Sequence, residues 1–155
     1  MKTRLLTAIA ALAVLCGCQT PHEFTAPDKA WKTHIGQLKY TDGDRTLIGD
    51  VVVRQRGAHD FQLDFQKAAG VPLLALHEDA TTAQAEGVLA RGSWQGKPAA
   101  APKHLRNWLA LREAFVNPAS VGSWAGQPKS TRGQLTSLSL NFPEDGQRFH
   151  FQFNR

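Results

Sequence analysis

Residues 138–153 read LSLNFPEDGQRFHFQF, and this stretch decides the fold. Apolar and polar residues alternate over residues 138–142 and again over residues 149–153. Such alternation is typical of a β-strand that buries one face, because successive side chains point to opposite faces of a sheet. Residues 143–146, PEDG, have the composition of a turn. The stretch therefore predicts an antiparallel hairpin, and we expect its last strand to be paired inside the sheet.

The same two-residue period recurs upstream of this hairpin. Phe61, Leu63 and Phe65 alternate with polar residues and form the clearest further strand. Short alternating runs that are separated by glycine-containing turns are typical of an antiparallel sheet. We expect additional strands over residues 35–40, 46–55, 71–77, 81–86 and 88–94.

One segment has helical rather than strand-like spacing. We expect a helix over residues 102–116, because Pro102 suits the first helical position and Pro118 suits the stop. Apolar residues recur within it at three- and four-residue intervals, which places them on one stripe that must be laid on the sheet. The residues at this spacing are Leu105, Trp108, Leu109, Arg112 and Phe115 or Val116.

Two segments allow more than one interpretation. Residues 28–38 could begin with a helix that Asp28 caps, because Trp31, Ile35 and Leu38 would share one helical face. The same residues could instead enter the strand expected from residue 35. After the helix, glycine and proline predict a loop over residues 121–128, and the structure of residues 119–134 as a whole is left open.

The start of the chain has the features of an exported and lipidated protein. A basic beginning precedes an apolar run over residues 5–15, which is typical of a signal peptide and short for a membrane-spanning helix. Residues 15–18, LCGC, are similar to a bacterial lipobox, which implies cleavage between Gly17 and Cys18 and lipidation of Cys18. A Cys-x-Cys metal or redox pair would need further ligands, and the chain has no third cysteine.

These features divide the chain into three parts. Residues 1–17 form the signal peptide, residues 18–27 a lipidated flexible tether with two prolines, and residues 28–155 a single β-rich domain. Loss of Lys2 and Arg4 with the signal lowers the net charge from +5 to +3. This modest charge argues against nucleic acid as a partner.

Motifs for catalysis are missing from the sequence. The six histidines do not have the spacing of a zinc site, and neither a Gly-x-Ser-x-Gly elbow nor a glycine-rich phosphate loop occurs. We therefore expect no metal, no cofactor and no enzymatic activity.

What the sequence supplies in excess is apolar surface on one face of the sheet, with one helix to cover it. Ala83, Ala85, Ala90 and Gly92 are small inward residues that would leave room beneath that helix. The space could be an apolar cavity for an acyl chain, or the residues could close into an ordinary filled core. The expected lining of the cavity is Phe61, Leu63, Phe65, Leu74, Leu76, Trp94, Leu105, Trp108 and Leu109.

Four stretches resemble the family of the outer-membrane lipoprotein receptor LolB and, more distantly, the periplasmic carrier LolA. They are residues 31–34 (WKTH), 54–63, 101–109 and 138–153. The resemblance implies an antiparallel, incomplete and half-open β-barrel that amphipathic helices cover. It also implies binding of lipid or lipoprotein acyl chains, a membrane reached through the lipid anchor, and a periplasmic LolA-like carrier as a partner.

The chain departs from that family in two respects that concern transfer. It is shorter between the helix and the final hairpin, and Ala69 stands where the family has a leucine thought to touch the membrane. Alanine offers a bilayer far less apolar area than leucine does. The resemblance therefore supports the fold more than it supports the transfer function.

The sequence leads to two functional hypotheses. The first is a lipoprotein at the periplasmic face of the outer membrane that binds acyl chains and acts in lipoprotein localisation. Gln19 after the lipidated cysteine favours the outer membrane, and the inner membrane is the alternative. The second hypothesis is a structural or interaction lipoprotein of the envelope, with a filled core and no ligand.

Overall fold

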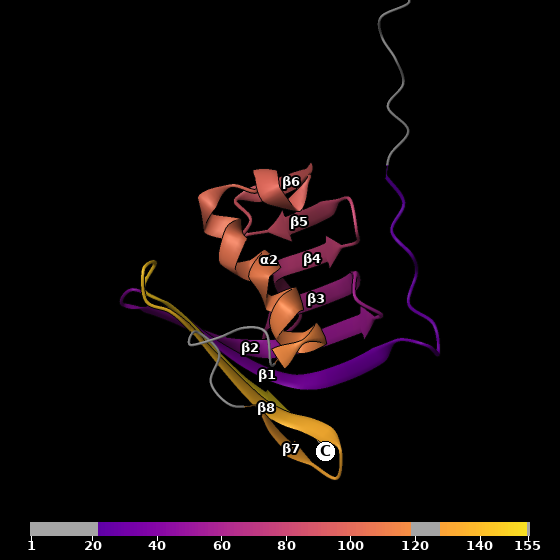
Figure 1. The fold of residues 1–155 in the computed structure, drawn as a ribbon. Coiled ribbons are helices and arrows are strands. Elements are labelled where there is room, and N and C mark those ends of the chain that lie inside the picture. Colours follow the sequence, from indigo (N-terminus) through magenta and orange to yellow (C-terminus); the bar gives the residue numbers. More distant parts are fainter. Residues whose placement is uncertain (1–21, 119–127, 155) are drawn as a thin grey trace, which may run out of the picture.

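The computed structural model describes residues 22–118 and 128–154. Within them, nine antiparallel strands form one open sheet, and a 14-residue helix lies across one of its faces (Figure 1). The strands are β1 (Lys32–Asp42), β2 (Arg45–Arg56), β3 (Asp60–Lys67), β4 (Val71–Glu78), β5 (Ala83–Gly87), β6 (Gly92–Gly96), β7 (Lys129–Thr131), β8 (Gln134–Phe142) and β9 (Gln147–Phe153). A 3-10 turn, η2 (Pro98–Ala100), precedes the helix α2 (Lys103–Val116). No helix within these ranges is long and apolar enough to cross a membrane.

The order of the strands across the sheet is β6-β5-β4-β3-β2-β1-β9-β8-β7. The first six strands form a meander, and the final hairpin joins it when β9 pairs with β1. Phe151 of β9 is the register partner of Leu38 on one side and of Leu138 on the other. The expected hairpin, with its last strand inside the sheet, is confirmed.

Close approach of β9 to β1 depends on a glycine. A Cβ atom at Gly36 would lie 2.1 Å from the carbonyl oxygen of Gln152 and 2.6 Å from the Cα of Phe153. Only a residue without a side chain fits between two backbones at that separation.

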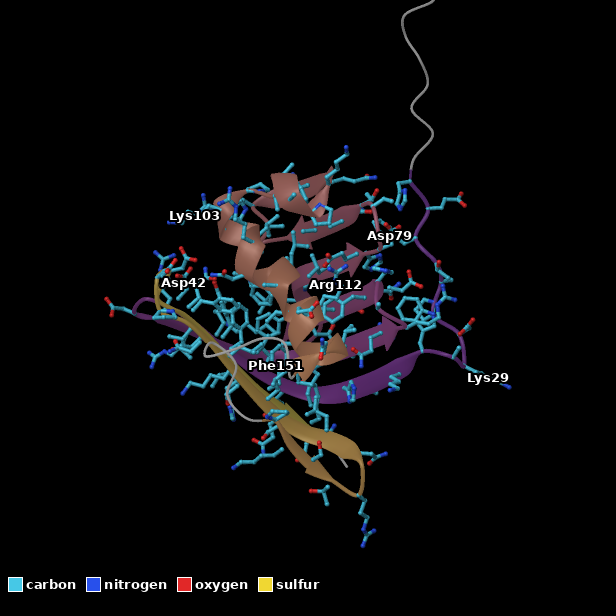
Figure 2. All side chains as sticks on the ribbon, in the orientation of Figure 1. Lys29, Asp42, Asp79, Lys103, Arg112 and Phe151 are labelled. Carbon is cyan, nitrogen blue, oxygen red and sulfur yellow. The ribbon has the colours of Figure 1, made fainter. Side chains whose placement is uncertain are left out.

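The inner face of the sheet and the helix enclose one apolar core. Leu105 and Trp108 of α2 are buried against the sheet, as the apolar stripe predicted. The Trp108 ring lies 4.8 Å from the rings of both Tyr40 and Phe149. Phe151 projects into the same space between helix and sheet (Figure 2). Aromatic rings at these separations pack as tightly as protein interiors normally do.

The first part of α2 also connects the two arms of the sheet. Near its beginning, the His104 ring lies 3.3 Å from the carbonyl oxygen of Ala90 in the β5–β6 turn. Asn107 donates to Asp145, at 2.9 Å, in the β8–β9 turn. The helix therefore spans from one arm of the open sheet to the other.

Residues 28–38 do not begin with a helix, so one of their two interpretations is wrong. Asp28 does not cap a helix: its carboxylate accepts a hydrogen bond from the backbone of Ala30 in a turn. The chain is extended from Lys32 onward, because β1 pairs along most of its length with β2 and β9. Strand pairing on both sides outweighs the local helical spacing.

Part of the predicted tether contacts the domain. His22 lies 2.5 Å from the Asp79 carboxylate, and the Phe24 ring packs edge-on against His77 at 5.6 Å. Figure 2 shows Asp79 beside this segment. Gly17 and Cys18 lie outside the described residues, as do residues 121–127 of the expected loop.

The strand expected over residues 88–94 and the strand β7 differ most from the sequence prediction. The run expected over residues 88–94 becomes a strand only at Gly92, because a turn with Arg91 in the left-handed region (φ 59°) precedes it. Gly92 is exposed and is not one of the inward small residues. The short strand β7 was not predicted, since its three residues are all exposed and show no alternation.

Candidate functional site

The residues expected to line a cavity do come together on the inner face. All nine belong to or pack against one core cluster, and Trp94 is the one that stays half-buried, at the edge of the cluster. Phe61, Leu63 and Leu76 have no exposed surface. These side chains fill the space beneath the middle of α2 with one another.

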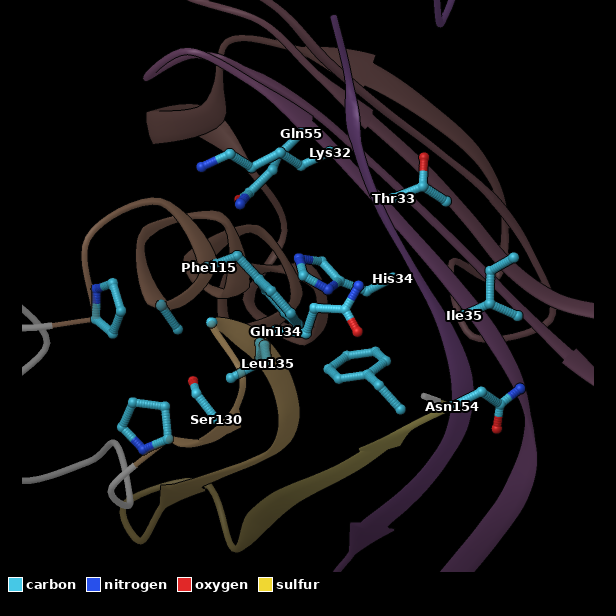
Figure 3. A pocket seen from close by; sticks show the side chains of 15 residues that line it. Lys32, Thr33, His34, Ile35, Gln55, Phe115, Ser130, Gln134, Leu135 and Asn154 are labelled. Atoms are coloured by element: carbon cyan, nitrogen blue, oxygen red, sulfur yellow. The ribbon is translucent and has the colours of Figure 1, made fainter. Parts of the chain in front are cut away.

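A groove lies beside the C-terminal end of α2. Its volume is about 700 Å³, within the range of about 300–1,000 Å³ that small-molecule sites occupy. It is formed by the start of β1, the end of β2, the C-terminal end of α2, the β7–β8 hairpin and the end of β9 (Figure 3). The lining residues are Lys32, Thr33, His34, Ile35, Gln55, Ala114, Phe115, Pro118, Pro128, Ser130, Gly133, Gln134, Leu135, Phe153 and Asn154.

One wall of the groove is aromatic and continues into the core. Phe115 and Phe153 face each other with ring centroids 5.9 Å apart, and each is only 6% exposed. Phe115 also packs against Phe151 at 5.2 Å and against Phe61 at 5.8 Å. An apolar group in the groove would therefore rest on the outermost rings of the core cluster. Leu135 adds a half-buried aliphatic side chain from β8.

His34 belongs to this wall more than to the polar rim. Its ring lies 5.2 Å from that of Phe153 and 6.1 Å from that of Phe115. Burial, and then the positive charge of Lys32, lower the pKa of His34 below its ordinary value of 6.5. The imidazole is therefore neutral at neutral pH and packs as an aromatic ring.

The opposite rim of the groove is polar. Lys32 is exposed and Gln55 is half-buried there, at the ends of β1 and β2, and Gln134 is exposed on the β7–β8 hairpin. The side-chain oxygen of Gln55 is buried and has no hydrogen-bond partner among the described residues. An unsatisfied buried acceptor costs about 1–3 kcal/mol, which a hydrogen bond from a ligand would offset once the Gln55 side chain turned toward the groove. An apolar wall that faces a polar rim suits an amphiphile.

A buried ion pair lies next to the groove at the same end of the sheet. Gln55 is the register partner of Phe61, and Phe61 is the partner of Glu78. A Glu78 carboxylate oxygen lies 3.3 Å from the Arg112 guanidinium of α2, and the Glu78 side chain is 2% exposed. Burial raises the pKa of Glu78 from 4.5 to about 7, against the opposing effect of Arg112 and with a smaller contribution from Asp79.

This pair is incompletely satisfied. The second carboxylate oxygen of Glu78, the Nε of Arg112 and the indole nitrogen of Trp31 are buried and have no hydrogen-bond partner within the described residues. Such groups are rare in closed cores, because each one forfeits its bonds to water. The sheet end beside the groove is therefore the polar end of the core.

A serine–histidine pair lies outside the groove. Ser139 and His150 are hydrogen bonded at 2.7 Å across β8 and β9, but both are exposed on the outer face and neither lines the groove. No group of three or more His, Cys, Asp or Glu that could hold a metal ion occurs within residues 22–118 and 128–154. The contact between Ser139 and His150 is accounted for by cross-strand pairing.

The groove was not predicted from the sequence, although some of its residues carried a signal. Lys32 and His34 lie within the WKTH stretch, and Phe153 ends the strongest hairpin. Phe115 was assigned to the apolar stripe of the helix. Only the strand register, which places these residues beside one another, reveals the site. No known family model matches this chain, and no curated protein matches it.

Proposed function

We propose that this chain is a lipid-anchored lipoprotein of the outer membrane that binds the acyl chain of a lipid or of another lipoprotein. The groove beside the end of α2 carries the proposal, because its aromatic wall is continuous with the core and its rim is polar. In this proposal Cys18 bears the anchor and the domain takes part in lipoprotein localisation, with a LolA-like carrier as donor.

The size of the groove suits reversible binding. Burying about eight methylene groups contributes about 6 kcal/mol. Association costs at least about 4 kcal/mol in lost translational and rotational freedom. The small difference predicts a weak and quickly exchanging complex, which is what a protein that receives and releases acyl chains requires.

Uptake of a fluorescent fatty acid by the mature chain tests the proposal. The chain from residue 18 carries Cys18→Ser, so that it has no lipid of its own. We expect saturable uptake by this protein and loss of uptake in Leu135→Asp, because a carboxylate on the groove wall opposes an apolar ligand. Val88→Asp is the matched control, since Val88 is 68% exposed and lies away from the groove. Absence of uptake, or equal uptake by both variants, would contradict acyl binding in this groove.

Lipidation is tested separately with labelled palmitate. We expect label on the wild-type chain and none on Cys18→Ser. Equal labelling of both chains would contradict lipidation of Cys18. Depletion of the protein, followed by fractionation of other lipoproteins, then tests the role in localisation.

A second candidate is a structural lipoprotein without a ligand. The closed packing beneath the middle of α2 favours it, because the residues first expected to line a cavity are buried against one another. It predicts a mature chain that takes up no acyl ligand and whose loss leaves the distribution of other lipoproteins unchanged.

A further inference from the structure

We propose that the groove selects amphiphiles with a single acyl chain and an anionic headgroup, which Lys32 binds at the groove mouth. The inference rests on the proposed acyl binding and adds to it the charge and the position of the headgroup. Carboxylate and phosphate headgroups share this chemistry, and the experiment below separates them.

The charge of the groove is carried by one residue. Among the described residues that line it, Lys32 is the only one with a charged side chain at neutral pH, since His34 is neutral, and no aspartate or glutamate contributes to the lining. Lys32 is exposed and makes no ion pair with another described residue. An unpaired ammonium at the rim of an apolar groove attracts an anion, and it does so without breaking an internal contact.

The hairpin that forms the opposite rim has the same sign of charge. Residues 129–135, KSTRGQL, include Lys129 and Arg132 and no acidic residue. Both basic residues are exposed. Neither of them lines the groove, so the positive charge at its mouth comes from Lys32, which favours a negative headgroup over a neutral or cationic one.

The arrangement of the groove fixes the orientation of such a ligand. Lys32 and Gln55 are register partners at the ends of β1 and β2, whereas Phe115 and Phe153 form the aromatic wall. Figure 3 shows Lys32 and Gln55 together on one side, with Leu135 on the other side of Phe115. A headgroup at Lys32 would place the chain along the phenylalanine rings. Rotation of the Gln55 side chain toward the groove would let its unpartnered oxygen accept a hydrogen bond from a hydroxyl next to the charge.

Binding of four amphiphiles with equal chain length tests the inference on the mature Cys18→Ser chain. They are a fatty acid, a lysophosphatidylglycerol, a lysophosphatidylcholine and a neutral monoacylglycerol. We expect the two anionic ligands to bind more tightly than the other two. We also expect lysophosphatidylglycerol, which carries hydroxyls beside its phosphate, to bind more tightly than the fatty acid. Inorganic phosphate alone should not compete, because the acyl chain supplies most of the affinity.

Lys32→Gln identifies the residue responsible, and Lys29→Gln is its control. Lys29 is also exposed but does not line the groove (Figure 2). Because exposed ion pairs are weak, we expect Lys32→Gln to weaken the anionic ligands about three- to fivefold, to leave monoacylglycerol binding unchanged and to remove the preference for negative charge. Lys29→Gln should change none of these.

The outcomes that overturn the inference differ from those that overturn acyl binding. If all four ligands bind the wild-type chain equally, or if Lys32→Gln weakens charged and neutral ligands alike, headgroup selection is wrong while acyl binding stands. If none of the four binds, the proposed function itself fails.

Discussion

The part of helix α2 around Trp108 and the part around Arg112 and Phe115 pack on the same sheet in different ways. Near Trp108, aromatic rings from the helix, β1 and β9 close around one another, and the Trp108 side chain is 1% exposed. Near Arg112 and Phe115, the same helix covers a buried ion pair with unpartnered polar atoms and borders an open groove. We call these regions the closed end and the groove end.

The difference shows where this fold departs from ordinary core packing. A protein gains nothing in stability from unsatisfied buried polar groups, and they are kept chiefly at sites with another role. Strands β1 and β9 take part in both regions, so the departure at the groove end does not come from a separate part of the sheet. It comes from a few polar side chains at inward positions of one row across the sheet, Gln55 and Glu78 above all.

The closed end should be the more costly of the two to disturb. We expect Trp108→Ala to lower the free energy of unfolding by about 3–5 kcal/mol, because the truncation leaves a cavity among rings that cannot collapse into it. Urea unfolding of the chain from residue 18 with Cys18→Ser measures the change. Val88→Ala is the control and should stay within about 0.5 kcal/mol of wild type. An unfolding midpoint of Trp108→Ala equal to that of wild type would contradict tight packing around Trp108.

The groove end should dominate the pH dependence of stability. The pKa of Glu78 is about 7 in the folded chain and 4.5 ordinarily, so the folded state takes up a proton between these values. Protonated Glu78 therefore stabilises the folded state fully below about pH 4.5, and this contribution is lost as the pH rises through 7. Since one pKa unit corresponds to about 1.4 kcal/mol, the loss amounts to about 3 kcal/mol. Glu78→Gln should remove this slope, and an unchanged slope in that variant would assign the effect to another group.

Asp79, the next residue in the chain, should affect the pH dependence of stability in the opposite direction to Glu78. Burial alone would raise the pKa of Asp79, but hydrogen bonds from Thr81, Thr82 and His22 outweigh it and hold the pKa at about 2. Its contribution is therefore present above its ordinary pKa of 3.8 and is lost as the pH falls toward 2.

Asp79 also holds the N-terminal segment on the sheet. We expect Asp79→Asn to cost about 1 kcal/mol and to speed proteolysis of residues 22–31, because His22 loses its charged partner. Glu23→Gln is the control, since Glu23 is an exposed neighbour. Equal proteolysis of the two variants would show that the segment does not depend on this contact.

The sequence predicts the closed end far better than it predicts the groove end. Alternation over residues 61–65 and 138–153 is a local property of the chain, and it identifies the strands and the buried faces that meet Trp108. The groove combines Lys32, Gln55, Phe115 and Phe153, which come from four elements. Their proximity depends on the register between strands, and no local pattern encodes the register of β9 against β1. The strand β7 was missed for a related reason, since three exposed residues carry no periodicity.

The β3–β4 turn holds one strained residue. Relief of that strain is the smallest change in unfolding free energy that we predict. The turn between β3 and β4 places Ala69 at φ 72°, in the left-handed region that glycine adopts most easily. That conformation costs a residue with a Cβ about 1–2 kcal/mol. The flexibility of glycine in the unfolded chain costs about 0.5–1 kcal/mol.

Ala69→Gly should therefore stabilise the domain by about 0.5–1 kcal/mol, which is the difference between those two costs. Ala68→Gly is the matched control one position earlier, where the alanine has no positive φ. It should destabilise by about 0.5–1 kcal/mol, because only the entropic cost applies. Thermal unfolding of both variants measures the pair, and acyl binding should be unchanged in each because this turn does not line the groove. Effects of the same sign in the two variants would contradict strain at Ala69, because only a positive φ at that position makes glycine the better residue there.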